Sequence, residues 1–570
     1  MSSRRPTSGG FRGAGGVISC RVMTSRRSVL LVILIFLANA GLLLVREQQV
    51  TGDPWNFPVD DAWIHMTFAR NLAFGLGFGV NPGEPVAAST SVSWALWLAV
   101  LHRAVAGFGM RAVVFAVKGS GVLLAVVAII GAMRLLKRFI DDDTDRAVAG
   151  LLLIFSYPLA WGALSGMEVA LCAACAIWAL DYQVSACGDS PGPRDREISI
   201  ACWSLAFLAR PENVLLLGLA LLIFLAHERE SRLRLAGRLL LIAGLCVVPF
   251  VLFHAEIAGQ PFPHTFTSKM TPRALPRAIV EMPAAEAMRA VAGSVLDHLR
   301  VGVEFLLLES PFVGLLYLAA PFLAWKTGFG RSAPPALSAG MAMAWIALPL
   351  LAVSVGILTG SMYYTVHHGR YIPQTILMAA FCGIAGFHRF WNATGRSRWI
   401  VLPLLFSLVF ALDRQVELAE DHARECDIIR RIHVSLGKWL NELPKGLTVA
   451  LNDIGGMAYF GGQRIIDLEG LASPETNSWR RQGRIDLFLE RVKPDLLIIF
   501  PGWFPEIASR PEIFRPIFIR TVEENITGGG NVKAVYRMPW SRGLPDPWPA
   551  LPPSGLPTDV PVPPLPERHE

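Results

Sequence analysis

The sequence predicts an all-α polytopic membrane protein followed by a small α/β domain outside the membrane. Hydrophobic residues make up 53% of the 570 residues and charged residues only 17%, with a mean hydropathy of +0.44, which excludes an ordinary soluble protein. The apolar residues form blocks approaching the roughly 20 residues that a helix needs to cross a bilayer. Beyond residue 412 the pattern changes to short apolar runs between helical stretches, which is typical of a mixed α/β domain.

About 11 membrane-spanning helices are expected. The alternating ten-residue segments of outer-membrane barrels do not occur, so the spans are helical. The segment 92–108 contains His102 and Arg103 beside two tryptophans, and we expect it to lie at the membrane surface without crossing. The predicted spans are residues 29–46, 112–133, 147–163, 167–183, 198–209, 213–226, 238–257, 303–325, 335–358, 371–388 and 399–412.

Basic residues predict the orientation of these spans. Six arginines and no acid precede the first span, which favours a cytoplasmic N-terminus with residues 1–28 as a basic tail. A cleaved signal peptide is the alternative, but Ala38–Asn39–Ala40 lies too deep in the apolar block for a cleavage site. The short basic loops then face the cytoplasm, whereas the long segment 258–302 lies outside despite containing Lys269, Arg273, Arg277 and Arg289. We therefore expect a multi-pass protein of the bacterial inner membrane. The net charge of +7 could suggest a nucleic-acid partner, but the positions of the basic residues are those of an orientation signal, so no nucleic-acid partner is expected.

Three regions outside the bilayer follow from this orientation, one of which is the segment 258–302. The membrane part, 29–412, has a first periplasmic loop at 47–111, and a periplasmic α/β domain is predicted at 413–540. Residues 541–570 are proline-rich, so they are expected to be disordered. The domain should contain helices near 422–442 and 484–491 and strands at 447–451, 464–468 and 495–500. It has no GxGxxG or P-loop motif, so acceptor binding or packing on the membrane part is expected of it, without a nucleotide site.

Two adjacent acids, Asp60 and Asp61, follow the first span. One acid is enough to cap a helix, and ionisable groups near a membrane are functional by default. A carboxylate could deprotonate a hydroxyl that attacks the anomeric carbon of a sugar, and cations would then face a phosphate leaving group. The pair is therefore a candidate catalytic site.

An ordered set of motifs follows the acid pair. It comprises Ala69–Arg70–Asn71–Leu72, Gly75–Leu76–Gly77 and Asn81–Pro82–Gly83–Glu84. The stretch resembles the opening loop of class C (GT-C) glycosyltransferases, membrane enzymes that take sugars from polyprenyl-phosphate donors on the outer side. Most similar are the mycobacterial terminal arabinofuranosyltransferase group and related bacterial proteins. Shorter islands extend the resemblance over about 30–540: Ser165–Glu168, Arg210–Glu212, His368–Tyr371, Asn452–Gly455 and Ile466–Leu468. This chain departs from the pattern at His65 and Ala87–Ser91, which affects the predicted sugar and acceptor more than the reaction class.

The resemblance implies that Asp60 or Asp61 is the general base. The expected reaction moves a sugar, for which a pentofuranose such as arabinofuranose is one candidate, to a hydroxyl of a cell-envelope glycan or lipid. Arg370 with the adjacent histidines is the best candidate for the donor phosphate, because the guanidinium presents a fork of N–H donors. The further substrate-binding candidates are His367, His368, Lys269, Arg210, Glu168 and Arg70.

Each of these candidates has a structural alternative. Lys269 could simply extend to the membrane surface, Arg210 could form an ion pair with Glu212, and Glu168 could favour the start of a helix electrostatically. No cofactor is certain. A divalent cation (Mg²⁺, Mn²⁺ or Ca²⁺) held by the acid pair, Glu168 and histidines is conceivable, although no spacing specifies it.

Two other functions remain open at this stage. A transporter or flippase of lipid-linked sugars would commonly show two related halves, which are not evident. A non-catalytic scaffold leaves the stretch from Asp60 to Glu84 unexplained. The expected partners are a polyprenyl-phosphate sugar, a glycan or lipid acceptor, and membrane lipids.

Overall fold

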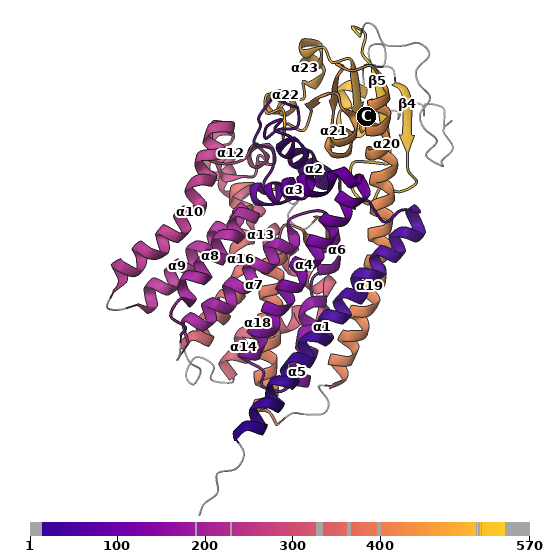
Figure 1. Ribbon diagram of the computed structural model, residues 1–570. Coiled ribbons are helices and arrows are strands. Elements are labelled where there is room, and N and C mark those ends of the chain that lie inside the picture. Colours follow the sequence, from indigo (N-terminus) through magenta and orange to yellow (C-terminus); the bar gives the residue numbers. More distant parts are fainter. Residues whose placement is uncertain are drawn as a thin grey trace, which may run out of the picture.

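A helical bundle carries a small sheet domain at one end in the computed structural model (Figure 1). The structure describes residues 14–188, 191–228, 231–326, 335–361, 366–395, 401–508, 510, 514 and 516–541. The predictions for residues 1–13 and 542–570 lie outside this part of the chain. Helices α2 (Asp60–Ala73) and α3 (Val92–Val105) lie between the bundle and the sheet domain.

The helices of the bundle agree with a multi-pass membrane protein. Within the described residues, five helices are long and apolar enough to span a membrane: Arg26–Thr51, Met110–Lys137, Val169–Ala186, Arg232–Ala258 and Ala339–Leu358. Shorter apolar helices occupy Val92–Phe108, Pro211–His227 and Pro311–Leu323, so the expected number of 11 spans stays a prediction. The bundle comprises α1 (Ala14–Thr51), α4 (Met110–Lys137), α5 (Asp143–Phe155), α6 (Leu159–Leu164), α7 (Val169–Ala186), α8 (Asp195–Ala209), α9 (Val214–His227), α10 (Arg232–Ala258), α14 (Pro311–Lys326), α16 (Pro335–Leu358), α18 (Pro373–Ala393) and α19 (Val401–Ile429).

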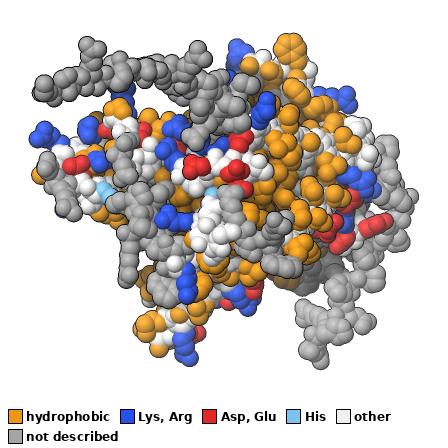
Figure 2. Space-filling view, turned by 90° about the horizontal axis from the view of Figure 1, so that it is seen from below, with side chains coloured by type: hydrophobic (Ala, Val, Ile, Leu, Met, Phe, Trp, Pro, Cys, Tyr) orange, Lys and Arg blue, Asp and Glu red, His pale blue; other side chains and the backbone are white. Residues whose placement is uncertain are grey.

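The end of the bundle opposite the sheet domain combines apolar and charged areas. Seen from below, hydrophobic side chains form a broad area beside groups of Lys, Arg, Asp and Glu (Figure 2). Arg134 and Arg138 at the end of α4 both pair with the fully buried Asp181 of α7. The charge rule assigns this end to the cytoplasm, and this orientation stays a prediction.

Prolines divide two of the predicted spans. The segment 147–163 forms α5 and α6, which are separated at Ser156–Pro158, and 303–325 forms the end of α13 (Ala284–Glu309) and α14. Proline lacks an N–H and restricts the preceding residue, so helices commonly end before it and restart at it. The outer segment 258–302 contains α11 (His264–Ser268), α12 (Leu275–Glu281) and most of α13.

A single helical rod joins the bundle to the sheet domain. Helix α19 continues through a π-helical turn, η5 (Arg430–Val434), into α20 (Ser435–Glu442). The boundary predicted at 412/413 lies inside this rod, because neither proline nor glycine occurs between Pro403 and Gly437 to interrupt the helix. The sheet domain is thus held at a fixed distance from the membrane part.

The sheet has five strands in the order β2-β1-β3-β5-β4. β1 (Thr448–Leu451) pairs in parallel with β2 (Arg464–Asp467) and β3 (Leu496–Ile499), which are the three predicted strands. β4 (Pro516–Thr521) and β5 (Val532–Arg537) add an antiparallel edge. Helices α20 and α21 (Gly455–Gly461) pack on one face and α23 (Ile485–Val492) on the other. α22 (Thr476–Arg481), η6 (Pro501–Trp503) and α24 (Pro505–Ala508) complete the domain.

The first outer loop and the sheet domain share one hydrophobic core. Ile64, Phe68 and Phe78 of the loop pack in the same cluster as Trp439 of α20. The edge of β2 is extended by Asn81, whose Oδ1 accepts from Ile465 N at 2.8 Å and whose Nδ2 donates to Ile465 O at 2.9 Å. The C-terminal domain therefore helps to fix the position of the first outer loop and of α2.

Replacing Asn81 with alanine is expected to loosen this contact. Both main-chain groups of Ile465 lose their partner, which costs about 1–3 kcal/mol where such groups are buried. Hydrogen exchange of the β2 amides should therefore accelerate. The matched control is Glu84→Ala, which removes the exposed ion pair with Arg464 and an exposed hydrogen bond from Asn81 Nδ2, the ion pair being worth about 0–1 kcal/mol, but leaves both bonds between Asn81 and Ile465; equal effects of the two changes would contradict the edge pairing.

Candidate active site

The two adjacent aspartates point to different partners. Asp61 forms an ion pair with Nη2 of Arg370, which lies just before α18. Asp60 accepts hydrogen bonds from Gly455 N at 2.7 Å and Gly456 N at 2.8 Å. Consecutive residues of a helix project about 100° apart, so one aspartate faces the membrane part and the other faces the sheet domain.

Asp60 is enclosed at the interface with the sheet domain. Its oxygens bind the first N–H groups of α21, which follows β1 directly. Burial, and then the nearby Asp453 carboxylate, raise the pKa of Asp60 to about 8, while the two N–H bonds oppose the shift. His433 Nδ1 lies 3.4 Å from Asp60 Oδ1. Asp60 therefore connects the first outer loop to the C-terminal domain.

Two N–H groups of Arg370 have no partner within the described part of the chain. Its side chain is nearly fully buried, and Nη2 also donates to the Tyr371 hydroxyl at 2.7 Å. Nε and Nη1 are buried and have no hydrogen-bond partner among the residues that the structure describes. Unpaired buried guanidinium donors are costly, so this pair of donors is suited to an anionic ligand.

Three predicted cations converge on Tyr371, which the sequence analysis did not single out. Lys269 Nζ donates to its hydroxyl at 3.0 Å. Arg210, Arg370 and Lys269 lie 4.5, 4.8 and 5.0 Å from the centre of its ring. The Tyr371 hydroxyl also accepts from Arg370, so two of the cations meet at one oxygen atom.

Arg210 is neutralised by two carboxylates. Its Nη1 donates to Glu168 at 2.6 Å and its Nη2 to Glu212 at 2.8 Å. His65 Nε2 lies 3.4 Å from the second oxygen of Glu168. The Glu168 side chain makes no capping hydrogen bond to α7. Arg210 therefore forms the ion pair with Glu212 that the sequence suggested, and it also lies beside Tyr371. The carboxylates of Glu168 and Glu212 already balance its charge.

The pKa values of the two histidines before Arg370 are shifted in opposite directions. Burial, and then Arg370, lower the pKa of His367 to about 4, so it is neutral at pH 7. His368 pairs with Glu425 at 3.1 Å, and this carboxylate raises the pKa of His368 against the effect of burial. The cationic character of the cluster therefore comes from Arg370 and Lys269.

Arg70 lies at the domain interface. Its Nη1 donates to the Tyr459 main-chain oxygen, and its guanidinium lies 5.1 Å from the Tyr459 ring centre. The neighbouring Asn71 donates to Gly79 O at 2.8 Å, which closes the loop back onto α2. These two motif residues support the loop that holds Asp61.

Known proteins resemble this chain in its C-terminal domain and in its overall fold. Residues 422–538 match a family described as a domain of unknown function, DUF8728. No curated protein matches the chain significantly. The oligosaccharyltransferase of Archaeoglobus fulgidus, in complex with Zn and sulfate, is similar with a TM-score of 0.53 at 11% identity, over 86% of this chain and 72% of that one. ArnT from Cupriavidus metallidurans, bound to undecaprenyl phosphate, has a TM-score of 0.50 at 13% identity over 88% and 97%.

A third structure is the A. fulgidus oligosaccharyltransferase AglB with an inhibitory peptide and a dolichol-phosphate. Its TM-score is 0.50 at 11% identity, over 90% of this chain and 74% of that one. The fold is that of a class C glycosyltransferase. This confirms the fold expected from the motifs after Asp60, while the resemblance to the arabinofuranosyltransferase group stays a prediction. Identities this low establish the fold alone.

A group that could hold a metal ion lies apart from the acid pair of this class C fold. Glu47, His422 and Cys426 are fully buried between α1 and α19, and their ligand atoms lie within 4.8 Å of one another. Glu47 also accepts from Lys118 Nζ at 2.7 Å, so a lysine already balances its charge. The oxygen, nitrogen and sulfur ligands suit Zn²⁺ better than the oxygen-preferring ions considered from the sequence.

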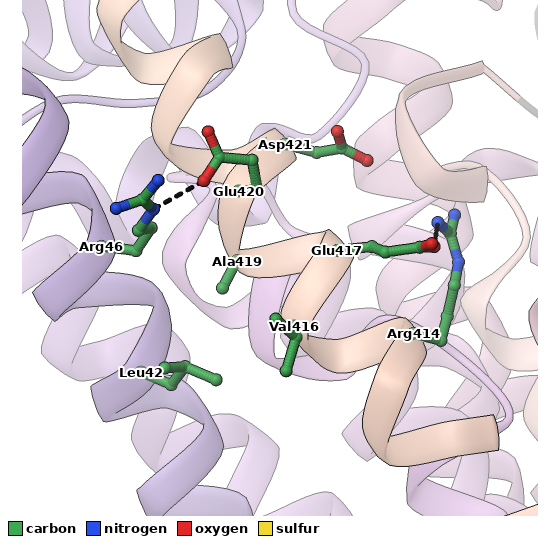
Figure 3. Close-up of a pocket in the computed structure, with 8 residues that line it drawn as sticks. All are labelled: Leu42, Arg46, Arg414, Val416, Glu417, Ala419, Glu420 and Asp421. Atoms are coloured by element: carbon green, nitrogen blue, oxygen red, sulfur yellow. Dashed lines mark hydrogen bonds and ion pairs between the residues drawn. The ribbon is translucent and has the colours of Figure 1, made fainter. Parts of the chain in front are cut away.

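An open hollow of about 620 Å³ lies beside this group on the surface of α1 and α19 (Figure 3). Its arginines are paired with carboxylates, Arg46 with Glu420 at 2.6 Å and Arg414 with Glu417 at 2.9 Å. Neither Asp61 nor Arg370 lines it. The hollow is therefore distinct from the candidate active site.

Acidification tests the pair of Asp61 and Arg370. Although burial opposes the shift, Arg370 and then Lys269 hold the pKa of Asp61 well below its ordinary value of 3.8. A carboxyl whose pKa is lower in the folded state stabilises the fold above its unfolded pKa, and this contribution is lost as the pH falls through the folded-state pKa. The thermal midpoint in detergent should therefore fall below about pH 4 more steeply in the native protein than in Asp61→Asn. Parallel curves would contradict the pairing.

Proposed function

We propose that the protein transfers a sugar from a polyprenyl-phosphate donor to a hydroxyl of a cell-envelope glycan or lipid, on the periplasmic side of a bacterial inner membrane. The observation that supports this most is the buried Arg370, whose Nε and Nη1 lack a protein partner within the described residues and whose Nη2 pairs with Asp61. The structures of similar fold include one with undecaprenyl phosphate and one with a dolichol-phosphate.

The proposed step replaces one carbon–oxygen bond of the sugar with another and transfers one proton. The acceptor oxygen bonds to the anomeric carbon as the bond from that carbon to the phosphate oxygen breaks, with inversion. The hydroxyl proton passes to the Asp61 carboxylate, and the electron pair leaves with the prenyl phosphate. Negative charge therefore grows on the phosphate, where Arg370 and Lys269 stabilise it more in the transition state than in the bound donor.

Asp61 is the better base of the two acids. The oxygens of Asp60 are occupied by Gly455 N and Gly456 N, whereas the side chain of Asp61 is 36% exposed. While paired with Arg370, Asp61 has a low pKa and is a weak base, because proton transfer works best with a pKa near the working pH. A phosphate that binds Arg370 offsets its positive charge, so the pKa of Asp61 rises when the donor is present. Donor binding would thus activate the base.

Residues around Arg370 and Lys269 hold these two cations in position. The Tyr371 hydroxyl accepts from both Arg370 and Lys269, and Arg210 stacks on its ring between Glu168 and Glu212. This arrangement orients Arg370 and Lys269 toward one phosphate. The resemblance of residues 60–84 to the arabinofuranosyltransferase group supports a pentofuranose such as arabinofuranose as the sugar.

The test is a transfer assay with the purified full-length protein in lipid nanodiscs. It would use a panel of radiolabelled prenyl-phosphate sugars, including the arabinofuranosyl donor, with envelope glycan and lipid acceptors. Added Zn²⁺, Mg²⁺, Mn²⁺ and Ca²⁺ and a chelator form separate arms. We expect labelled product from at least one donor. If the protein in vesicles instead moved labelled donors across the membrane without any transfer of sugar, it would be a transporter.

A further inference from the structure

Three consecutive residues before Arg370 adopt the left-handed conformation. The φ angles of His367, His368 and Gly369 are +49°, +54° and +65°, and Arg370 N donates to His367 O at 3.2 Å to close the turn. Outside glycine this conformation is unfavourable, because Cβ comes too close to the following carbonyl oxygen. Such a backbone persists only where the surrounding structure holds it.

Glu425 of α19 holds the second of these residues. Its Oε1 lies 3.1 Å from His368 Nε2, and its Oε2 accepts from Trp161 Nε1 at 2.7 Å. The Trp161 and His368 rings lie 4.9 Å apart, so the imidazole is packed as well as hydrogen-bonded. Glu425 is only 3% exposed, and both of its oxygens are used. A buried charged group with two good partners fixes a side chain far better than an exposed one.

The third residue is enclosed on its other side. Gly369 O accepts from the Tyr157 hydroxyl at 3.4 Å, and a Cβ built on Gly369 would lie 2.6 Å from the Phe305 ring. The turn is therefore confined by α6, α13 and α19 at once. The residue that leaves this turn is Arg370, which points to Asp61.

We infer that Glu425 is a positioning residue for Arg370. It holds His368 in the left-handed turn, and the turn directs the Arg370 guanidinium toward Asp61 and the space for an anion. Glu425 itself touches neither Asp61 nor the Arg370 side chain among the contacts of the described residues. The inference rests on the proposed function for the identity of the anion, a prenyl phosphate, but its effect on the turn does not.

The test compares Glu425→Gln with Glu420→Gln in the full-length protein. Glutamine keeps the shape of the side chain but loses the charge-assisted contacts. We expect faster hydrogen exchange in 366–372 and about tenfold weaker binding of undecaprenyl phosphate, the effect of releasing the strain of one left-handed residue. Glu420 lies on the same helix and pairs with the half-exposed Arg46, so its change should leave both measurements within twofold.

A second substitution that restores binding would distinguish positioning of the backbone by Glu425 from a direct effect of its charge. Glycine adopts the left-handed conformation without strain, so His368→Gly introduced into the Glu425→Gln variant should return undecaprenyl-phosphate binding to within about threefold of native. Failure of this rescue would show that Glu425 acts through its charge, and unchanged exchange in 366–372 in Glu425→Gln would also overturn the inference. If the native protein transfers no sugar, the proposed function fails, but the exchange measurement still decides the role of Glu425.

Discussion

Replacing Asp61 with asparagine is expected to lower the rate of sugar transfer by about 10²–10⁴-fold, the contribution typical of a positioned general base. Asparagine has nearly the same shape as aspartate but cannot take up the acceptor proton at neutral pH. It can still accept a hydrogen bond from Arg370, so the protein should insert and fold. Binding of undecaprenyl phosphate should be unchanged or tighter, because Arg370 no longer shares its charge with Asp61. The measurement is transfer of labelled sugar beside binding of the lipid phosphate.

Asp60→Asn is the matched control for this prediction. Its amide can accept from only one side, so one of the N–H groups of Gly455 and Gly456 loses an acceptor and the contact with the sheet domain weakens. The expected loss of transfer is smaller, within about tenfold, and should be accompanied by faster hydrogen exchange in α21. Full activity in both variants would remove the proposed mechanism, and a loss confined to Asp60→Asn would reverse the two roles.

The sequence predicts the location of this site but not the separate roles of Asp60 and Asp61. Adjacency of Asp60 and Asp61 suggests a shared role, yet a helix directs neighbouring side chains to different surroundings. Which surroundings they meet depends on Gly455, nearly 400 positions later in the chain. No local pattern contains that information. The motifs after the acid pair have a similar explanation, since Arg70 and Asn81 contact Tyr459 and Ile465 of the C-terminal domain.

Helices and buried strands are predicted well because their signal is local. The strands β1, β2 and β3 are short runs of apolar residues, and turn residues such as Gly446, Gly470 and Pro501 lie nearby. β5 escaped prediction because Lys533 interrupts its apolar pattern, although that lysine is fully buried and donates to Asn452 O at 2.8 Å. A buried lysine is rare without a partner, and the partner lies on another segment.

Tyr371 is a residue of the candidate site that its position within a motif could have indicated. It directly follows Arg370 in the island that resembles the class C pattern, but a lone tyrosine at the start of a span is more often an anchor at the membrane surface. Its hydroxyl becomes part of the candidate site only because Lys269 approaches from a separate outer loop. Arrangements of this kind follow from tertiary packing and are not encoded in residue spacing.

Arg370→Lys is expected to weaken the binding of undecaprenyl phosphate by about 10- to 100-fold, which corresponds to the loss of one or two charge-assisted hydrogen bonds. Lysine keeps the charge but replaces a planar fork with a single ammonium group on a shorter side chain. That group can satisfy Asp61 or the Tyr371 hydroxyl, but it cannot also present the two donors that Nε and Nη1 provide. Binding of the lipid phosphate to the protein in nanodiscs measures the effect without requiring transfer.

Arg210→Lys distinguishes the geometry of Arg370 from the total charge around Tyr371. Both arginines are buried and lie over the same ring, at 4.5 and 4.8 Å from its centre, but the terminal N–H groups of Arg210 are directed at Glu168 and Glu212. Its replacement should lower the thermal midpoint, because the buried Glu168 and the partly exposed Glu212 lose a good partner, and leave lipid-phosphate binding within about threefold. If both variants weakened binding equally, the phosphate would respond to the summed field of the cations. A selective loss in Arg370→Lys would assign binding to Nε and Nη1 of Arg370, which have no partner within the described residues, beside the proposed base Asp61.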